Sequence, residues 1–123
     1  MNHTALQSIL VDLNKESPDI EASAIMSIDG LVMASQLPTD MDEDRLGAVS
    51  AAIVSLGDQA MIELICGGTM KQIVVSGEAG CMMITHAGDD AVVATIIKAN
   101  AELGLVSNEI QRAAIDVTEE LLH

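Results

Sequence analysis

The two ends of the chain repeat their apolar residues at helical spacing. Between residues 4 and 16, leucine and isoleucine recur every three or four positions, after a Thr-Ala-Leu-Gln start that has the form of a capping box. From about Asn100 to Leu122 the apolar stripe consists of Leu103, Val106, Ile110, Ala114, Val117 and Leu121. Both segments therefore predict amphipathic helices, each with one buried face.

Four other stretches read as β-strands or hairpins: residues 22–35, 71–76, 81–86 and 91–97. Within the first, Asp29-Gly30 predicts a two-residue hairpin turn that places Ile28 opposite Leu31 and Met26 opposite Met33. The later three stretches are joined by connections of about four residues, which favours antiparallel neighbours. The flanks of the Asp-Gly turn are apolar on both faces, so the sheet is expected to be covered on both sides.

A middle helix is expected between residues 40 and 65, with acidic residues in its first turn, where they complement the helix dipole. Its main apolar stripe, expected to face the sheet, consists of Leu46, Val49, Ile53, Leu56, Ala60 and Leu64. The opposite side is small or apolar along most of its length and contains Gly47, Ala51, Val54, Asp58, Ile62 and Ile65. A helix that is apolar nearly all round is usually buried on both sides, so this side predicts an interface.

The order of these elements predicts an α+β fold. We expect a single three-layer domain over residues 1–123, in which a five-stranded antiparallel sheet has the first and last helices on one face and the middle helix on the other. The strand at residues 71–76 follows a helix and opens a meander, so it is expected at an edge. An apolar, proline-free edge is protected by pairing with its own copy, or it is blunted by Lys71 alone.

Composition narrows the range of partners. The 123 residues carry a formal net charge of −14, with five scattered basic residues and no aromatic residue. A nucleic-acid binder needs a basic footprint, so no nucleic-acid partner is expected. Neither a secretory signal nor a bilayer-spanning apolar run is recognisable, so a cytoplasmic protein without membrane insertion is expected.

Residues with catalytic or metal-binding chemistry form no recognisable motif. His86 with Asp89 or Asp90 would be an acid–base pair, but a turn histidine beside a carboxylate is common. Cys66, Cys81 and His86 do not match the ligand spacing of a zinc site. The sequence thus predicts no enzyme, no metal and no cofactor.

Taken together, the segments resemble the Roadblock family of dynein light chains and bacterial small-GTPase partners. The resemblance rests most on residues 24–35, AIMSIDGLVMAS, in which an apolar strand is followed by Asp-Gly and Leu-Val-x-Ala-Ser. It extends to the alanine-rich helix from Arg45 to Leu64, the strands from Lys71 to Ile97, and Leu103-Gly104 at the start of the last helix.

The resemblance implies a profilin-like Roadblock fold and a homodimer joined through the third strand and the middle helix. The dimer interface is expected to include Gly47, Lys71, Gln72, Ile73, Val74 and Val75. The paired middle helices would form a platform for a Ras-like small GTPase, drawn on this chain from Ala51, Val54, Ser55, Asp58, Gln59 and Ile62. The resemblance further implies a non-enzymatic regulator or scaffold that modulates GTP hydrolysis by reshaping its partner. A static assembly subunit and a small-ligand sensor remain as alternatives.

Overall fold

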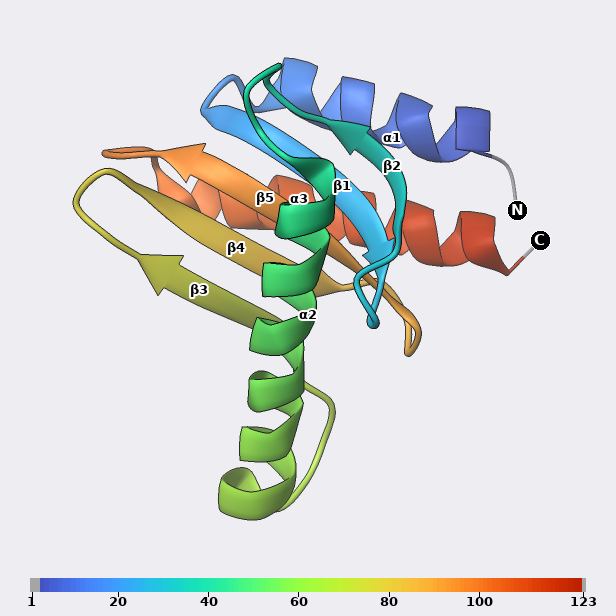
Figure 1. The fold of residues 1–123 in the computed structure, drawn as a ribbon, viewed down its shortest axis with the longest axis vertical. Helices are drawn as coiled ribbons and strands as arrows, with labels where there is room; N and C mark the ends of the chain where they lie inside the picture. The colour runs from blue at the N-terminus through green and yellow to red at the C-terminus, as the bar shows by residue number, and fades with distance from the viewer. Residues whose placement is uncertain (1–2, 123) are drawn as a thin grey trace.

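Three helices and five strands follow one another in the predicted order in the computed structural model, which describes residues 3–122 (Figure 1). The elements are α1 (His3–Glu16), β1 (Ile20–Ser27), β2 (Val32–Gln36), α2 (Glu43–Ala60), β3 (Gln72–Ser76), β4 (Gly80–His86), β5 (Ala91–Lys98) and α3 (Leu103–Leu121). A π-helical segment, η1 (Met61–Ile65), extends α2. The predicted α+β architecture is confirmed.

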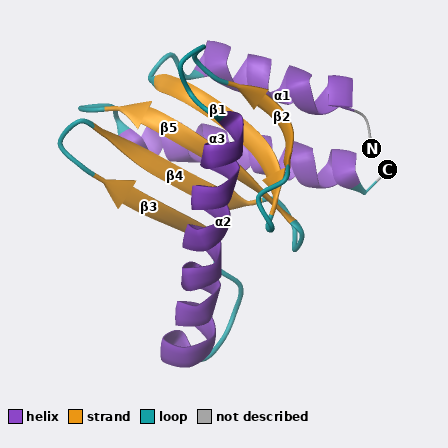
Figure 2. Ribbon diagram, viewed as in Figure 1, coloured by secondary structure: helices purple, strands orange, loops and turns teal. Residues whose placement is uncertain are grey.

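The five strands form one antiparallel sheet in the order β2-β1-β5-β4-β3. Helices α1 and α3 lie side by side behind the sheet, and α2 crosses its front face (Figure 2). Strand β3 pairs only with β4 among the described residues, so the prediction that it forms an edge is confirmed. The lower half of α2 and η1 extend beyond the sheet (Figure 1).

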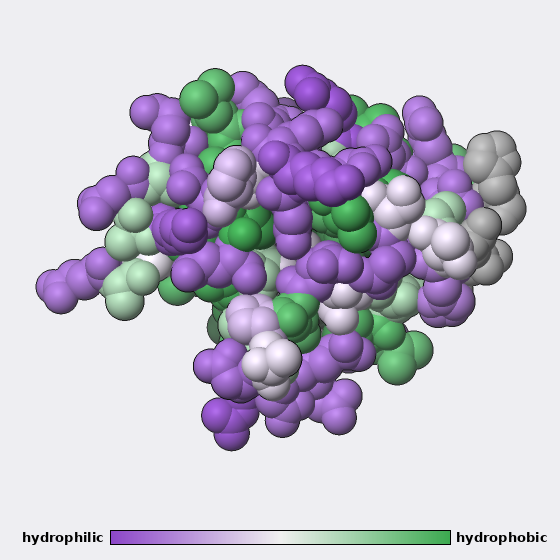
Figure 3. Space-filling model, turned by 90° about the horizontal axis from the view of Figure 1, so that it is seen from above, coloured by the Kyte–Doolittle hydropathy of each residue, from purple (hydrophilic) through white to green (hydrophobic). Residues whose placement is uncertain are grey.

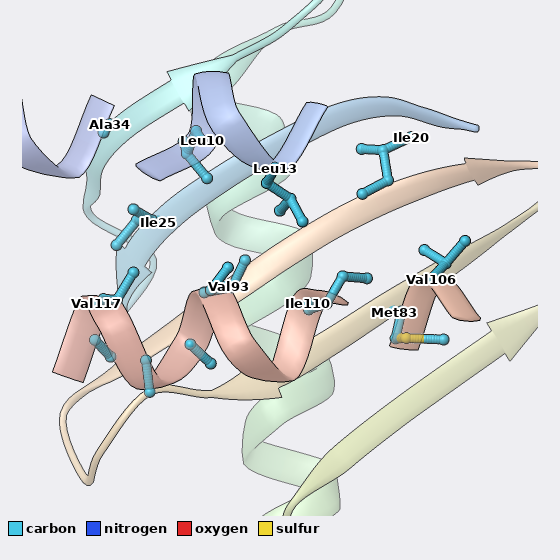
Figure 4. Packing of buried hydrophobic residues seen from close by; sticks show 14 of the residues in the cluster. Leu10, Leu13, Ile20, Ile25, Ala34, Met83, Val93, Val106, Ile110 and Val117 are labelled. Carbon is cyan, nitrogen blue, oxygen red and sulfur yellow. The ribbon is translucent and has the colours of Figure 1, made fainter. Parts of the chain in front are cut away.

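Two apolar clusters lie on the two faces of the sheet. The larger one, between the sheet and helices α1 and α3, contains Leu10, Ile25, Val93 and Ile110 (Figure 4). The smaller one lies under α2 and contains Met26, Val54 and Ile84. Seen from above, hydrophilic side chains cover much of the surface and apolar ones emerge as separate patches (Figure 3).

The register of the first hairpin differs from the prediction. Ile25 pairs with Ala34, but Met26 pairs with Val32 rather than with Met33, so Met33 is an extra residue on β2. The amide of Ser27 donates to the carbonyl of Leu31 at 3.0 Å, which closes a three-residue loop rather than a two-residue turn. Only Gly30 of the Asp-Gly pair has positive φ, at +92°. A three-residue loop with glycine in that position is a common alternative that the same dipeptide accommodates.

The face that α2 turns toward the sheet also differs from the prediction. Leu46 is buried, but Val49, Leu56 and Leu64 of the expected core stripe are exposed. The buried positions are instead Leu46, Gly47, Ser50 and Val54. The helix is rotated because two small residues on this face permit close approach: Gly47 lies against Gly30, and Gly57 lies against Met70 and Ile73.

The middle helix continues through η1 and ends at Ile65, the last residue of the predicted range. Cys66 adopts the left-handed conformation that stops the helix, with φ 63°. Its amide donates to the carbonyl of Met61 at 2.9 Å. Met61, the first residue of η1, is half-buried against the cluster under α2, and the other residues of η1 are exposed.

Candidate functional site

The free edge of β3 exposes backbone groups that β4 does not use. The amide of His86 donates to the carbonyl of Lys71, and the amide of Gly77 donates to the carbonyl of Gly80. The backbone N–H and C=O groups of the odd-numbered residues in this segment therefore point toward β4. In an antiparallel ladder the inward and outward directions alternate, so the N–H and C=O of Val74 point away from the sheet. Val74 and Val75 are about half exposed. The edge therefore offers both hydrogen-bonding groups and apolar surface.

One flank of α2 adjoins this edge and is apolar. Val49 is exposed, and Leu56 is 67% exposed. Between this flank and the sheet lies a groove of about 550 Å³, whose apolar lining includes Met41, Met82 and Ile96. Exposed large aliphatic residues on a helix flank, beside an apolar groove and an unpaired strand, are typical of a protein–protein interface.

The residues predicted for the dimer interface fall into two groups. Lys71, Gln72, Ile73, Val74 and Val75 all lie on or next to the free β3 edge. The Gln72 amide already donates to Ser107 at 3.0 Å on the α3 side. Gly47 is buried in its own chain against the Gly30 backbone, and its place in the dimer interface stays a prediction.

The opposite flank of α2 forms a second groove with the tip of the β1–β2 hairpin. This groove has a volume of about 480 Å³ and is lined by Ile28, Asp29, Val54, Ser55, Asp58, Gln59, Ile62 and Glu63. Five of the six predicted platform residues line it, and the sixth, Ala51, lies beside Gly30 at the hairpin tip. Val54 is only 2% exposed, so it can serve only as part of the floor.

Sequence reasoning missed Ile28, Asp29 and Glu63 as part of this surface. Ile28 and Asp29 belong to the hairpin loop, and only the packing of that loop on α2 brings them to the helix. The signal that was available is the pair Gly30 and Gly47. A Cβ at Gly30 would lie 2.6 Å from the Gly47 carbonyl oxygen, so both glycines are needed for this contact.

His86 lies behind the second groove rather than in a catalytic arrangement with its neighbours. Its Nε2 is 3.4 Å from the Oδ1 of Asp58, and its side chain is 10% exposed. Its Nδ1 lies 3.3 Å from the carbonyl oxygen of Gly88. Within residues 3–122 no ion pair joins His86 to Asp89 or Asp90, so His86 contacts α2 instead.

The two cysteines are separate and unlike each other. Cys66 is exposed and Cys81 is buried, and both thiols are free. Burial raises the pKa of the Cys81 thiol. Across residues 3–122 no three His, Cys, Asp or Glu side chains come together as metal ligands would.

The middle helix is long and largely apolar. By length and composition alone, Glu43–Ile65 is long and apolar enough to cross a membrane. Length and composition do not by themselves distinguish a membrane span from a helix of a folded domain, so the expected absence of membrane insertion stays a prediction. In the fold the same helix packs on the sheet through Leu46, Gly47 and Val54, and Val49 and Leu56 form the exposed flank described above.

The described residues form a three-layer α+β unit with an open edge strand and a helix that exposes two flanks. Residues 6–97 match the model of the Roadblock/LC7 domain. The chain belongs to the Roadblock/LC7 domain family, and the resemblance drawn from the sequence is confirmed.

The chain is also similar to a relative in an archaeon and to solved structures. The uncharacterized protein MJ0310 of Methanocaldococcus jannaschii is 34% identical over 109 residues, which are 89% of this chain and 93% of the relative. A Roadblock/LC7 domain structure from Streptomyces avermitilis superimposes with a TM-score of 0.89 at 22% identity, covering 95% of this chain and 98% of the other. The structure of Myxococcus xanthus MglB gives 0.88 at 20% identity, covering 98% and 90%. The two structures share the fold.

Proposed function

We propose that this chain is a cytoplasmic, non-enzymatic homodimeric regulator or scaffold that binds a Ras-like small GTPase. The observation that carries the proposal is the arrangement of α2, whose two flanks border two different grooves. One flank adjoins an unpaired strand and fits a second copy, and the other remains free for a different partner. Family membership supports the same assignment.

The proposed dimer joins the β3 edges of two copies around a two-fold axis near Val74. The outward backbone groups of β3 then pair with those of the partner strand, which extends the sheet and removes an exposed edge. The apolar flank of α2, with Val49 and Leu56, would pack against its equivalent over the groove floored by Met82 and Ile96. Because both copies present the same flank, the contact is self-complementary.

The proposed GTPase platform is the outer face of the paired α2 helices. Ser55, Gln59 and Ile62 are exposed there, and Ile62 is 76% exposed. Arg45 lies in the first turn of α2, away from these residues along the helix. The chain would therefore act by holding or reshaping the catalytic groups of its partner rather than by supplying one.

The test is a capture experiment that controls the nucleotide. The purified protein is immobilised, and an extract of the cells that naturally produce it is passed over it with a non-hydrolysable GTP analogue or with GDP. The proposal predicts retention of a Ras-like GTPase in one nucleotide state. Ile62→Asp should abolish retention, whereas the matched change Ile115→Asp on α3, at a residue that is 59% exposed, should not.

Other outcomes favour the alternatives. Proteins retained equally with both nucleotides would support a static assembly subunit, because a switchable partner must distinguish its own two states. If nothing is retained and a defined metabolite raises the melting temperature, the ligand-sensor alternative gains support instead.

A further inference from the structure

The groove between α2 and the hairpin tip has fixed walls. The Gly30 and Gly47 backbones touch, which holds the hairpin loop against the helix. The amide of Ile28 donates to the carbonyl of Asp90 at 3.1 Å, so the loop is also tied to the β4–β5 connection. A partner would therefore meet a groove that already exists, and binding would not need to order the loop.

The chemistry of this groove is divided between an apolar floor and an acidic rim. Ile28, Val54 and Ile62 provide the apolar surface, and the carboxylates of Asp29, Asp58 and Glu63 surround it. Neither lysine nor arginine lines the groove. In the part of the chain that the structure describes, the one basic side chain near these three carboxylates is His86, whose Nε2 lies 3.4 Å from the Oδ1 of Asp58.

We propose that this groove receives, from the protein that docks on α2, a long aliphatic side chain next to an arginine or a lysine. The volume of about 480 Å³ is sufficient for two large side chains. The aliphatic group would cover Val54 and Ile62, and the cation would lie between Asp29 and Glu63. The carboxylates would repel an acidic segment, and a purely polar segment would leave the apolar floor exposed to water.

This inference rests on the proposed function for the identity of the docking protein and adds the chemistry of its contact. The charge of the chain points the same way. A net charge of −14 favours partners that bring cations to the contact, and this groove places carboxylates around an apolar centre. Charges at such a rim act on specificity and association rate, and their effect weakens as salt rises.

Blocked dipeptides test the chemistry directly without a known partner. Acetyl-leucyl-arginine amide is titrated into isotope-labelled protein at low salt, and the methyl signals of Ile28, Val54 and Ile62 are followed by NMR. We expect saturable shifts confined to these methyl groups. Replacement of the arginine by glutamate, or of the leucine by serine, should weaken binding by about fivefold or more.

Charge-neutralising variants complete the test. Asp29→Asn with Glu63→Gln should reduce both the affinity for the leucyl-arginine peptide and its salt dependence, and Asn-Gly suits the same loop. Asp12→Asn with Glu78→Gln removes the same charge at exposed positions outside the groove and should have no effect. Absence of saturable shifts, equal binding of the acidic peptide, or equal effects of the two double variants would each overturn the inference.

The same variants separate this inference from the proposed function. If both the wild type and the Asp29→Asn, Glu63→Gln variant capture a GTPase equally, the groove chemistry is wrong and the proposed function stands. If the dipeptide binds as described but the chain captures no GTPase in either nucleotide state, the groove chemistry stands and the proposed function fails.

Discussion

The contact between Gly47 of α2 and Gly30 of the hairpin makes a quantitative prediction for Gly47→Ala. A Cβ at Gly30 would lie 2.6 Å from the Gly47 carbonyl oxygen, and a Cβ at Gly47 would lie even closer to the Gly30 carbonyl oxygen. Real Cβ atoms essentially never approach another atom within 3.0 Å. Because the opposing atom belongs to the backbone, the hairpin and helix must separate by about 1 Å. Such overpacking costs about 3 kcal/mol at a rigid contact.

A second effect of Gly47→Ala opposes the first. Alanine is favoured over glycine inside a helix by about 1 kcal/mol. The steric cost is larger, so we expect a net loss of about 2 kcal/mol in the free energy of unfolding. For a chain of this size that corresponds to a fall in melting temperature of about 8 °C.

Thermal unfolding followed by far-ultraviolet circular dichroism measures this shift, and it suits a chain without aromatic residues. Protein concentration must be held constant, because the proposed dimerisation would couple stability to it. Gly104→Ala in α3 is the control: its Cβ would meet nothing within 4 Å, so the substitution should leave stability equal or higher. If Gly47→Ala were as stable as Gly104→Ala, the hairpin would not pack on α2 and the second groove would not exist.

Two further predictions concern the apolar flank and the cysteines. Leu56→Asp should raise the dimer dissociation constant by about 100-fold or more, since it places a charge at the centre of the proposed contact. Leu105→Asp on α3 is the control and should leave this constant unchanged. Analytical ultracentrifugation measures the dissociation constant of both variants. Iodoacetamide should modify Cys66 in the folded protein and reach Cys81 only after denaturation, because burial raises the pKa of the Cys81 thiol and blocks access to it. Mass spectrometry showing equal labelling of both thiols would contradict the structure.

The first and last helices were predictable from the sequence because each has one face on which apolar residues recur at helical spacing. In α3 the buried residues include Val106, Ile110, Ala114 and Val117, which the helical period identifies without tertiary information. The strand order was constrained by short connections. These signals are local, so one sequence is enough to read them.

The orientation of α2 was not predictable in the same way. Apolar side chains occur on more than one flank of this helix, and the face that meets the chain's own sheet combines Leu46 and Val54 with the small residues Gly47, Ser50 and Gly57. Small residues carry little hydrophobic signal, although they allow the closest backbone approach. Periodicity therefore assigned the interface flank with Val49 and Leu56 to the core.

For a related reason, only the part of the second groove that α2 contributes was predictable from the sequence. The exposed residues Ser55, Gln59 and Ile62 follow from helix geometry once the helix is placed. The contribution of Asp29 depends on a loop of three rather than two residues and on where its tip rests. Both depend on the contact between Gly30 and Gly47, which lie far apart in the sequence.

The central claim is that two copies join through the free edge of β3, and proline at Val74 tests it most directly. Val74→Pro removes an amide that points away from β4, so the intramolecular ladder should survive while pairing with a second copy is lost. Val75→Pro is the control, because its amide faces β4 and its loss should destabilise the fold itself.

Sedimentation equilibrium at micromolar concentration is the deciding measurement. The account predicts twice the 12.8 kDa mass of one chain for the wild type, and a single-chain mass with unchanged circular dichroism for Val74→Pro. A folded Val74→Pro dimer, or a wild type that sediments as a single chain, would contradict the account.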